Sequence, residues 1–484
     1  MMPAPRILMA ASEMSPFAAT GGLGDVLGAL PPALAALGAE VHVVLPAYKT
    51  IKSPLAHGPI QTTLQVPFAG AVRDIGLRTV RHRDVAVSFV VADDLFGRDA
   101  LYGDPSGDFG DNPARFACFA QAVIALTARL DPLPDVLHCH DWQTGLIPAL
   151  ARTSPDARLT RIPTVFTIHN LGYQGRFGAA VWPLLGLDRR YFAPSHLEFY
   201  GDVNFLKAGL VFADRLTTVS PRYAEEIQTP AQGHGLDGVL RERRSVLRGI
   251  VNGIDTERWD PAHDPLIAAP FDADDLQGKA ACKADLQRSF GLPVAPHVPL
   301  LGMVTRLAEQ KGLDILAAAL PELLTLDAQL IILGSGDERY ERWVQDAGRR
   351  DPTRLAVRLA FDERLSHQVE AGADAFLMPS RYEPCGLNQM YSLRYGTVPI
   401  VRATGGLDDT IDDVDATPTG GTGFKFAEYT APALVATVRR ALARYADTAG
   451  WRRLMREGMR RDHSWSRVAA TYLDLYRELG APVA

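Results

Sequence analysis

The sequence predicts an α/β protein with two doubly wound, Rossmann-like domains and a C-terminal helix. Short apolar runs alternate with helical segments in the first half, and a second alternation of the same kind begins near residue 299. The stretch between them, residues 253–293, is rich in proline and aspartate. Alternation of this kind is typical of parallel sheets with crossover helices. We therefore expect domains at 1–252 and 253–461, followed by a helix at 462–484 that packs back on the first domain.

The first domain begins with the run RILMAASE, a predicted strand, followed by a predicted helix over 23–38 and a strand over 40–48. Each run combines β-branched or aliphatic residues with a polar terminus, as buried strands do. Further strands are expected at 85–93, 135–140, 163–170 and 214–220. Each of these is followed by polar residues suited to a loop or a helix start.

The second domain repeats the pattern, and a predicted helix over 313–326 follows its first strand. Its strands are expected at 299–306, 329–337, 354–361, 374–380 and 397–406. The terminal helix is expected to pack through Trp465, Tyr472, Leu473 and Tyr476. Ligands of such sheets bind outside the carboxyl ends of the strands. Two such sheets facing each other are expected to enclose a cleft between the domains.

Composition excludes several classes of function. The chain of 484 residues is 47% hydrophobic, enough for large cores, and its formal charge is −6. This charge disfavours a general nucleic-acid binder, whose affinity depends on neutralising phosphates. The four cysteines form no CxxC pair and no zinc spacing, and no apolar run approaches about 20 residues. We expect a cytoplasmic protein with reduced thiols, no metal, and no nucleic-acid or membrane partner; the oligomeric state stays open.

A glycine-rich turn follows the first strand. Gly21, Gly22 and Gly24 open a predicted helix, where backbone N–H groups can meet a phosphate or a sugar oxygen. The spacing is not that of G-x-G-x-x-G, so a plain strand-to-helix turn is an equally good interpretation. No lysine or arginine lies between Arg6 and Lys49, which leaves the turn without a cation of its own.

The second domain carries cations and a carboxylate at predicted strand ends. Arg306 ends the strand predicted at 299–306 and Lys311 lies five residues further on, where two positive charges suit a diphosphate leaving group. A pair of solvated surface charges is the alternative. Glu383 precedes Cys385, Gly386 and Leu387, which we expect to start a helix. Its carboxylate can accept hydrogen bonds from sugar hydroxyls, although helix capping is the simpler interpretation.

Histidines and an aspartate gather at two strand ends of the first domain. His138, His140 and Asp141 lie at the end of one predicted strand, and His169 at the end of another. Their spacing is not that of the ligands of a metal site. Strand ends of one parallel sheet share an edge, so we expect these residues to share the ligand cleft. Aspartate-rich stretches near residues 272–274 and 408–413 are better explained as solvated loops than as metal ligands.

An ordered set of motifs resembles the bacterial and plant glycogen (starch) synthases over nearly the whole chain. The motifs are TGGLGDV, PDVLHCHDW, TIHNLGYQG, FLKAGLVFAD, GIVNGID, TRLAEQKGLD, PSRYEPCGLNQ and GGLDDT, in family order. The resemblance implies the two-domain GT-B fold and transfer of glucose from a nucleotide sugar, in bacteria usually ADP-glucose, to the 4-OH at the non-reducing end of an α-1,4-glucan. It also implies retention of configuration by a front-face displacement, with no cofactor and no metal.

The resemblance assigns roles to individual residues. Arg306 and Lys311 neutralise the diphosphate, Glu383 holds and orients the donor glucose, and Asp141 and His169 line the sugar site. The other implied donor contacts are Gly21, Gly22, Asn252, Cys385, Gly386, Leu387, Thr404, Gly405 and Gly406, with Phe361 stacking on the nucleobase. Asn170 is implied to contact the acceptor or donor sugar, and Tyr102 to hold the glucan.

Three positions depart from the family pattern. Ala19 stands where the family usually has the lysine of K-T-G-G-L, Phe361 where a tyrosine is common, and Asn388 where threonine is frequent. Loss of one charged hydrogen bond to phosphate costs on the order of 1.5–3 kcal/mol, which weakens catalysis without abolishing it. Two alternatives stay open: a related transferase that uses UDP-glucose or another acceptor, and a non-catalytic glucan-binding homologue.

Overall fold

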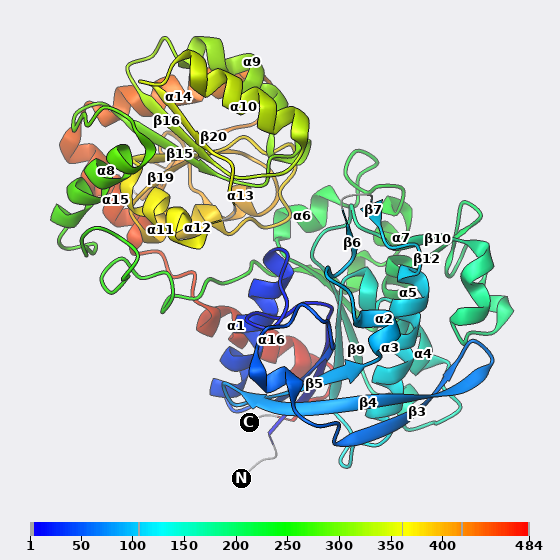
Figure 1. Cartoon of the computed structure of the whole chain (residues 1–484). Coiled ribbons are helices and arrows are strands. Elements are labelled where there is room, and N and C mark those ends of the chain that lie inside the picture. Colours follow the sequence, from blue (N-terminus) through cyan, green and yellow to red (C-terminus); the bar gives the residue numbers. More distant parts are fainter. Residues whose placement is uncertain (1–3, 105–106, 361, 418–419, 483–484) are drawn as a thin grey trace. The chain divides into compact units, whose positions relative to one another are not determined.

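The structure is a computed structural model that describes residues 4–104, 107–360, 362–417 and 420–482. The chain forms two compact units (Figure 1). The first comprises residues 1–253 together with 465–484, and the second comprises residues 254–464. No helix among the described residues has both the length and the apolar character needed to cross a bilayer.

The first unit is built on a nine-stranded sheet with the order β14-β13-β9-β8-β1-β2-β5-β4-β3. Its strands are β1 (Arg6–Ala10), β2 (Glu40–Pro46), β3 (Thr62–Phe68), β4 (Ala71–His82), β5 (Val85–Val91), β8 (Val136–His140), β9 (Thr164–Ile168), β13 (Arg215–Thr218) and β14 (Leu247–Gly249). Seven of these strands are parallel, as expected of a doubly wound sheet. The antiparallel pair β3–β4 was not predicted, because these strands bury only alternate residues and lack a continuous apolar run.

The first unit also contains helices and two small separate sheets. The helices are α1 (Gly22–Ala36), α2 (Asp93–Phe96), α3 (Asn112–Thr127), α4 (Leu146–Arg152), α5 (Phe205–Phe212), α6 (Pro221–Glu226), α7 (Asp237–Glu242) and α16 (Trp465–Glu478). Strands β10 (Arg176–Gly178), β12 (Asp202–Asn204) and β11 (Glu198–Phe199) form one small sheet, and β6 (Gly103–Asp104) pairs with β7 (Gly107–Asp108). The C-terminal α16 packs against α1, and its Tyr476 hydroxyl lies 2.8 Å from Nδ1 of His138 in β8.

The second unit contains a six-stranded, fully parallel sheet with the order β17-β16-β15-β18-β19-β20. Its strands are β15 (Leu300–Val304), β16 (Gln329–Leu333), β17 (Leu355–Arg358), β18 (Ala375–Met378), β19 (Val398–Arg402) and β20 (Phe424–Phe426). Its helices are α8 (Gln277–Phe290), α9 (Leu313–Leu323), α10 (Glu338–Arg350), α11 (Glu363–Gly372), α12 (Asn388–Arg394), α13 (Gly405–Thr410), α14 (Ala431–Tyr445) and α15 (Thr448–Met459).

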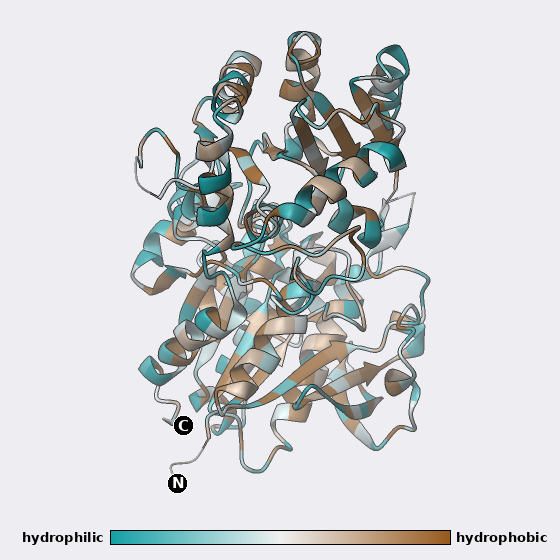
Figure 2. Cartoon of the chain, turned by 90° about the vertical axis from the view of Figure 1, so that its left-hand side faces the viewer, coloured by the Kyte–Doolittle hydropathy of each residue, from teal (hydrophilic) through white to brown (hydrophobic). Residues whose placement is uncertain are grey.

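Both faces of this second sheet are buried. Leu330 and Ile332 of β16 enter one apolar cluster, whereas Ile331 and Leu333 enter another on the opposite face. The strands are accordingly among the most hydrophobic segments of the ribbon (Figure 2). A strand covered by helices on both sides forms an unbroken apolar run, which is why these strands could be predicted from the sequence.

A buried lysine ties α8 to the loops around α11 and α12. The Nζ atom of Lys279 donates to the carbonyl oxygens of Ala371 and Tyr395 at 3.0 and 2.8 Å, and to Oγ1 of Thr397 at 2.7 Å. Burial lowers the pKa of Lys279 to about 8 and raises the pKa of the neighbouring Glu370 to about 8. One ammonium group therefore satisfies several buried acceptors at once.

Lys279→Met is expected to destabilise the second unit by about 3 kcal/mol, because it leaves those acceptors buried without a donor. Hydrogen exchange of the β18 and β19 amides at several urea concentrations measures this loss. The control is Lys52→Met at an exposed lysine, which we expect to change stability by less than about 0.5 kcal/mol. Equal protection of β18 and β19 in both variants would refute the stabilising role of Lys279.

Candidate functional site

The polar residues predicted for the second unit gather at one edge of its sheet. Strands β15, β18 and β19 are neighbours and run parallel, so their carboxyl ends lie side by side. The segment after β15 carries Arg306 and Lys311, and the segment after β18 carries Glu383. The segment after β19 carries Thr404, Gly405 and Gly406. This edge is where α/β sheets bind ligands.

Lys311 and Glu383 form an ion pair within this edge. The ammonium of Lys311 donates to both carboxylate oxygens, at 2.9 Å to Oε1 and 2.6 Å to Oε2. The hydroxyl of Ser380 donates to Oε2 at 2.9 Å. The Glu383 side chain is only 6% exposed, whereas that of Lys311 is 22% exposed. Three hydrogen bonds thus fix the carboxylate in one orientation, and the lysine stays accessible to a ligand.

Glycines allow the segments that follow β15, β18 and β19 to approach one another. A Cβ on Gly312, whose φ is +76°, would lie 1.9 Å from the carbonyl oxygen of Pro379. A Cβ on Gly405 would lie 1.9 Å from the carbonyl oxygen of Glu383, and one on Gly406 would lie 2.2 Å from that of Cys385. Any side chain at these positions would push the loops apart. The glycines therefore position the loop that carries Glu383.

The start of α12 corrects one prediction. Cys385, Gly386 and Leu387 precede the helix, which begins at Asn388, because Gly386 has a φ of +71° and cannot continue a right-handed helix. Asn388, the residue that departs from the family pattern, donates through Nδ2 to the carbonyl oxygen of Val304 at 2.7 Å. It therefore holds α12 against the end of β15. Arg306 is exposed, with Nη2 3.4 Å from Oε1 of Gln310.

In the first unit, the ends of two strands meet. Strands β8 and β9 are parallel neighbours. Oδ1 of Asp141 accepts the backbone N–H of His169 at 2.7 Å, and Nδ1 of His140 lies 3.0 Å from Nε2 of His169. His138 and His140 belong to β8 itself and point into the packed interior, where both are fully buried. Asp141 and His169, which follow their strands, are each 9% exposed.

Asp141 is held in an unusual state. Its backbone has a φ of +59° with a ψ of 179°, a strained conformation that residues other than glycine rarely adopt. Burial raises the pKa of its carboxyl to about 7, and the N–H groups of His169 and Asn170, which donate to it, limit the rise. Burial lowers the pKa of His169 to about 3. The site thus holds neutral histidines beside a carboxyl group that titrates near neutrality.

The glycine turn is anchored by Glu13, a residue that the sequence patterns do not single out. Its carboxylate accepts the backbone N–H of Thr20 at 2.5 Å and the Thr20 hydroxyl at 2.7 Å. The Tyr102 hydroxyl lies 2.7 Å from Oε1 of Glu13 and 2.7 Å from Oγ of Ser12. Tyr102 therefore supports the turn through Glu13. One signal for Glu13 is present in the sequence, since it is the last residue of the first predicted strand.

Gly21 and Gly22 are exposed, and apart from their chain neighbours and the backbone of α1, no atom of the described residues lies within 4 Å of the position that a Cβ would take at either one. Packing within the protein does not require glycine there, which leaves room for close approach of a ligand. Asn252 is 6% exposed, and its Oδ1 has no hydrogen-bond partner among the described residues. Oδ1 of Asn170 accepts the backbone N–H of Gly172 at 3.0 Å. Phe361 lies outside the described residues.

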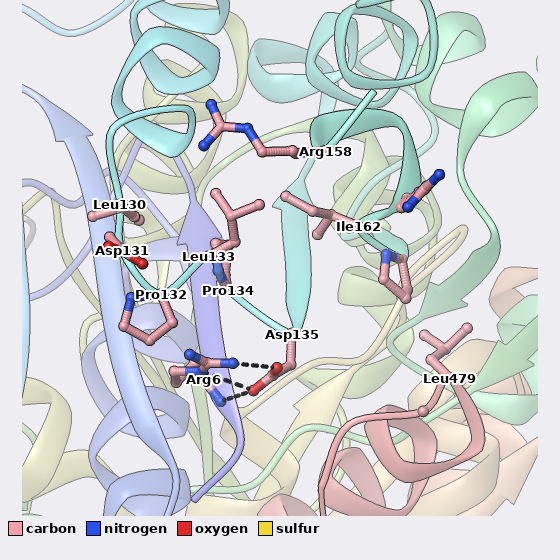
Figure 3. A pocket seen from close by; sticks show the side chains of 13 residues that line it. Arg6, Leu130, Asp131, Pro132, Leu133, Pro134, Asp135, Arg158, Ile162 and Leu479 are labelled. Atoms are coloured by element: carbon pink, nitrogen blue, oxygen red, sulfur yellow. Dashed lines mark hydrogen bonds and ion pairs between the residues drawn. The ribbon is translucent and has the colours of Figure 1, made fainter. Parts of the chain in front are cut away.

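A separate hollow of about 530 Å³ lies at the opposite, amino-terminal edge of the first sheet. Figure 3 shows Arg6 paired with Asp135 beside Pro132, Pro134 and Leu479. Most of its lining residues precede β8 or β9, whereas Asp141 and His169 follow these strands. This hollow is therefore distinct from the candidate site. Within the described part of the chain, no group of three or more His, Cys, Asp or Glu side chains is arranged to hold a metal ion.

Comparisons with known proteins agree with this arrangement. Residues 6–242 match the family described as "Starch synthase catalytic domain", and residues 289–455 match "Glycosyl transferases group 1". The chain is 54% identical over 479 residues to a glycogen synthase of Anaeromyxobacter dehalogenans strain 2CP-1, covering 98% of this chain and 99% of the relative. It is 50% identical over 475 residues to a glycogen synthase of Koribacter versatilis, covering 98% of each.

Solved structures give the same result. The catalytic domain of starch synthase IV from Arabidopsis thaliana, bound to ADP and acarbose, matches with a TM-score of 0.90 and 33% identity over 99% of both chains. A sucrose-phosphate synthase from Thermosynechococcus elongatus shares the fold, with a TM-score of 0.62 and 20% identity over 98% of this chain and 99% of that one. The predicted α/β fold class is confirmed. The chain belongs to the glycogen and starch synthase family of GT-B glycosyltransferases.

Proposed function

We propose that the chain is a glycogen synthase that transfers glucose from ADP-glucose to the non-reducing end of an α-1,4-glucan, with retention of configuration. The observation that carries this proposal is the Lys311–Glu383 pair at the ligand-binding edge of the second sheet, in a chain 54% identical to a glycogen synthase. The matched starch synthase IV structure holds ADP, which supports an adenine nucleotide as the donor.

In the proposed reaction, the bond between the anomeric carbon and the diphosphate oxygen breaks while the acceptor hydroxyl attacks from the same face. The departing diphosphate takes the proton of that hydroxyl. Lys311 and Arg306 stabilise the charge that develops on the diphosphate. Glu383 accepts hydrogen bonds from hydroxyls of the donor glucose and orients it. Gly386 and Leu387 offer backbone N–H groups to the donor, and Thr404, Gly405 and Gly406 allow its close approach at the end of β19.

Asp141 and His169 are proposed to bind the glucose, with Asn170 and Asn252 as further polar contacts. A carboxyl whose pKa lies near 7 can accept or donate a hydrogen bond to a sugar hydroxyl. No nucleophile–base pair is needed, because catalysis proceeds through positioning and stabilisation of the leaving group. No metal or cofactor is part of the proposal.

Nucleotide release from ADP-glucose and from UDP-glucose, each with and without glycogen, tests the function. We expect ADP release that depends on glycogen and a much slower reaction with UDP-glucose. A preference for UDP-glucose would overturn the proposed donor. Absence of release from either donor would overturn the proposed transfer and favour a glucan-binding homologue. The anomeric configuration of the new linkage, read by proton NMR, tests retention.

Ala19→Lys is expected to lower the KM for ADP-glucose or raise kcat by about tenfold, since a charged hydrogen bond to phosphate contributes about 1.5 kcal/mol or more. Ala19 is exposed and already carries a Cβ, so the longer side chain needs no repacking. Ala19→Met adds similar length without charge and is the control. Equal kinetics of the two variants would show that the site has no use for a cation at this turn.

A further inference from the structure

The two ring nitrogens of His140 differ in their surroundings. Nδ1 lies 3.0 Å from Nε2 of His169, whereas Nε2 is sealed from solvent and has no hydrogen-bond partner in the described part of the chain. One of these nitrogens carries a proton in the neutral ring. Orphaned N–H groups are rare in protein interiors. The arrangement therefore favours the tautomer of His140 with its proton on Nδ1, donated to His169.

His140 cannot easily turn away from this contact. Its ring lies 4.1 Å, centroid to centroid, from that of His138. His138 is itself fixed, because Nδ1 lies 2.8 Å from the Tyr476 hydroxyl and Nε2 lies 2.6 Å from Oγ1 of Thr167. Burial and the neighbouring histidines hold the pKa of His140 well below its usual value. His140 is thus a rigid, neutral donor.

The Nδ1–H donor of His140 determines which ring nitrogen of His169 carries a proton. If Nε2 of His169 accepts a hydrogen bond, its own proton must reside on Nδ1. Nδ1 of His169 makes no hydrogen bond to any described residue, and unlike Nε2 of His140 it is not sealed from solvent. His169 therefore presents an unused N–H at the edge of the sheet where Asp141 also lies.

We propose that His140 is a positioning residue that sets the tautomer of His169, so that Nδ1–H of His169 is a fixed hydrogen-bond donor to an oxygen of the bound sugar. The contact between His169 and the sugar rests on the proposed function. The effect of His140 on the tautomer of His169 concerns the unliganded protein alone. A neutral donor suits a neutral sugar, since it orients a hydroxyl without adding charge to the sugar site.

Histidine ¹⁵N NMR on the full chain tests the tautomer directly. The signals of His169 are assigned by their loss in His169→Gln. We expect wild-type His169 to carry its proton on Nδ1. His140→Asn keeps an N–H donor near the position of Nδ1 and is expected to preserve this tautomer, whereas His140→Leu removes the donor and allows the Nε2–H form. Nε2–H in the wild-type protein would overturn the proposal.

Steady-state kinetics of the same variants test the contact between His169 and the sugar. We expect His140→Leu to lower kcat by about tenfold, with the donor KM changed less than about threefold, and His140→Asn to recover most of the loss. His138→Phe is the matched control: it removes a buried histidine from the same strand but keeps an aromatic ring against that of His140, so the His140–His169 contact and the His169 tautomer should persist. Equal kcat losses in the Leu and Asn variants at position 140 would overturn the role. If wild type transfers no glucose at all, the proposed function fails while the tautomer result stands.

Discussion

Glu383→Gln is expected to lower kcat by about a hundredfold or more. In the wild-type protein the Lys311 ammonium donates hydrogen bonds to both carboxylate oxygens of Glu383. Glutamine keeps the shape of the side chain but lacks the negative charge that holds this ammonium. It also replaces one acceptor oxygen by an N–H₂ group that faces Lys311 and Ser380 as a donor. Misplacing one preorganised charge in a transition-state site typically costs about 3–4 kcal/mol. Steady-state glucosyl transfer at saturating donor and glycogen measures the effect.

Glu309→Gln is the matched control for this prediction. Glu309 lies on the same short turn as Lys311, but its side chain is 49% exposed and pairs with Arg339 and Arg381. We expect its kcat to stay within about twofold of wild type, because exposed ion pairs contribute little. The double variant of Glu383→Gln with Lys311→Met should cost less than the sum of the single losses, since the two residues act as one unit. Retention of about a third of wild-type kcat by Glu383→Gln would contradict the assigned role.

Much of this site could be predicted because its residues follow strands. Buried parallel strands form apolar runs, so Asp141, His169 and Glu383 could each be placed at a strand end from the sequence. The pairing of Lys311 with Glu383 could not be predicted, since it depends on β15 and β18 being neighbours although β16 and β17 lie between them in the chain. Strand order is a tertiary property that local pattern does not contain.

The supporting residues escaped prediction for a related reason. Ser380 and Glu13 are the last residues of predicted strands, yet nothing in their local sequence distinguishes a buried anchor from a solvated polar residue. Their roles depend on tertiary contacts: Ser380 donates a hydrogen bond to Glu383, and Glu13 accepts one from the backbone N–H of Thr20. The hairpin β3–β4 escaped because half of its residues face solvent, which breaks the apolar run. The start of α12 was misplaced because the left-handed backbone of Gly386 is invisible in sequence.

Asp141→Asn is expected to make the protein more stable at pH 8 and less active. In the folded state the pKa of Asp141 is about 7, against an ordinary value of 3.8 for an exposed aspartate. Between these values the folded protein binds more protons at this site than the unfolded chain does, so this group lowers the free energy of unfolding as pH rises. The loss is complete above the folded pKa and amounts to a few kcal/mol, on the order of 4 at most.

Asparagine removes the buried charge without disturbing the backbone. Its Oδ1 can still accept the N–H of His169, and asparagine has the same branching as aspartate, so it meets no more backbone strain at φ +59° and ψ 179° than aspartate does. The stability gain should therefore be largest, about 1–3 kcal/mol, at pH 8 and shrink as pH falls toward 5. Thermal unfolding across this pH range measures it. Asp99→Asn, at a side chain that is 91% exposed, should show no such pH-dependent gain.

The same substitution should lower kcat by about tenfold or more if the ionised carboxylate binds a sugar hydroxyl, because hydrogen bonds to charged groups contribute about 1.5–3 kcal/mol. Stability and turnover would then change in opposite directions at one residue. That outcome would show that the Asp141 carboxylate lowers the stability of the fold and raises turnover. Strained and desolvated groups in active sites generally have this double effect. An Asn variant that is both less stable at pH 8 and fully active would show instead that Asp141 serves the fold alone.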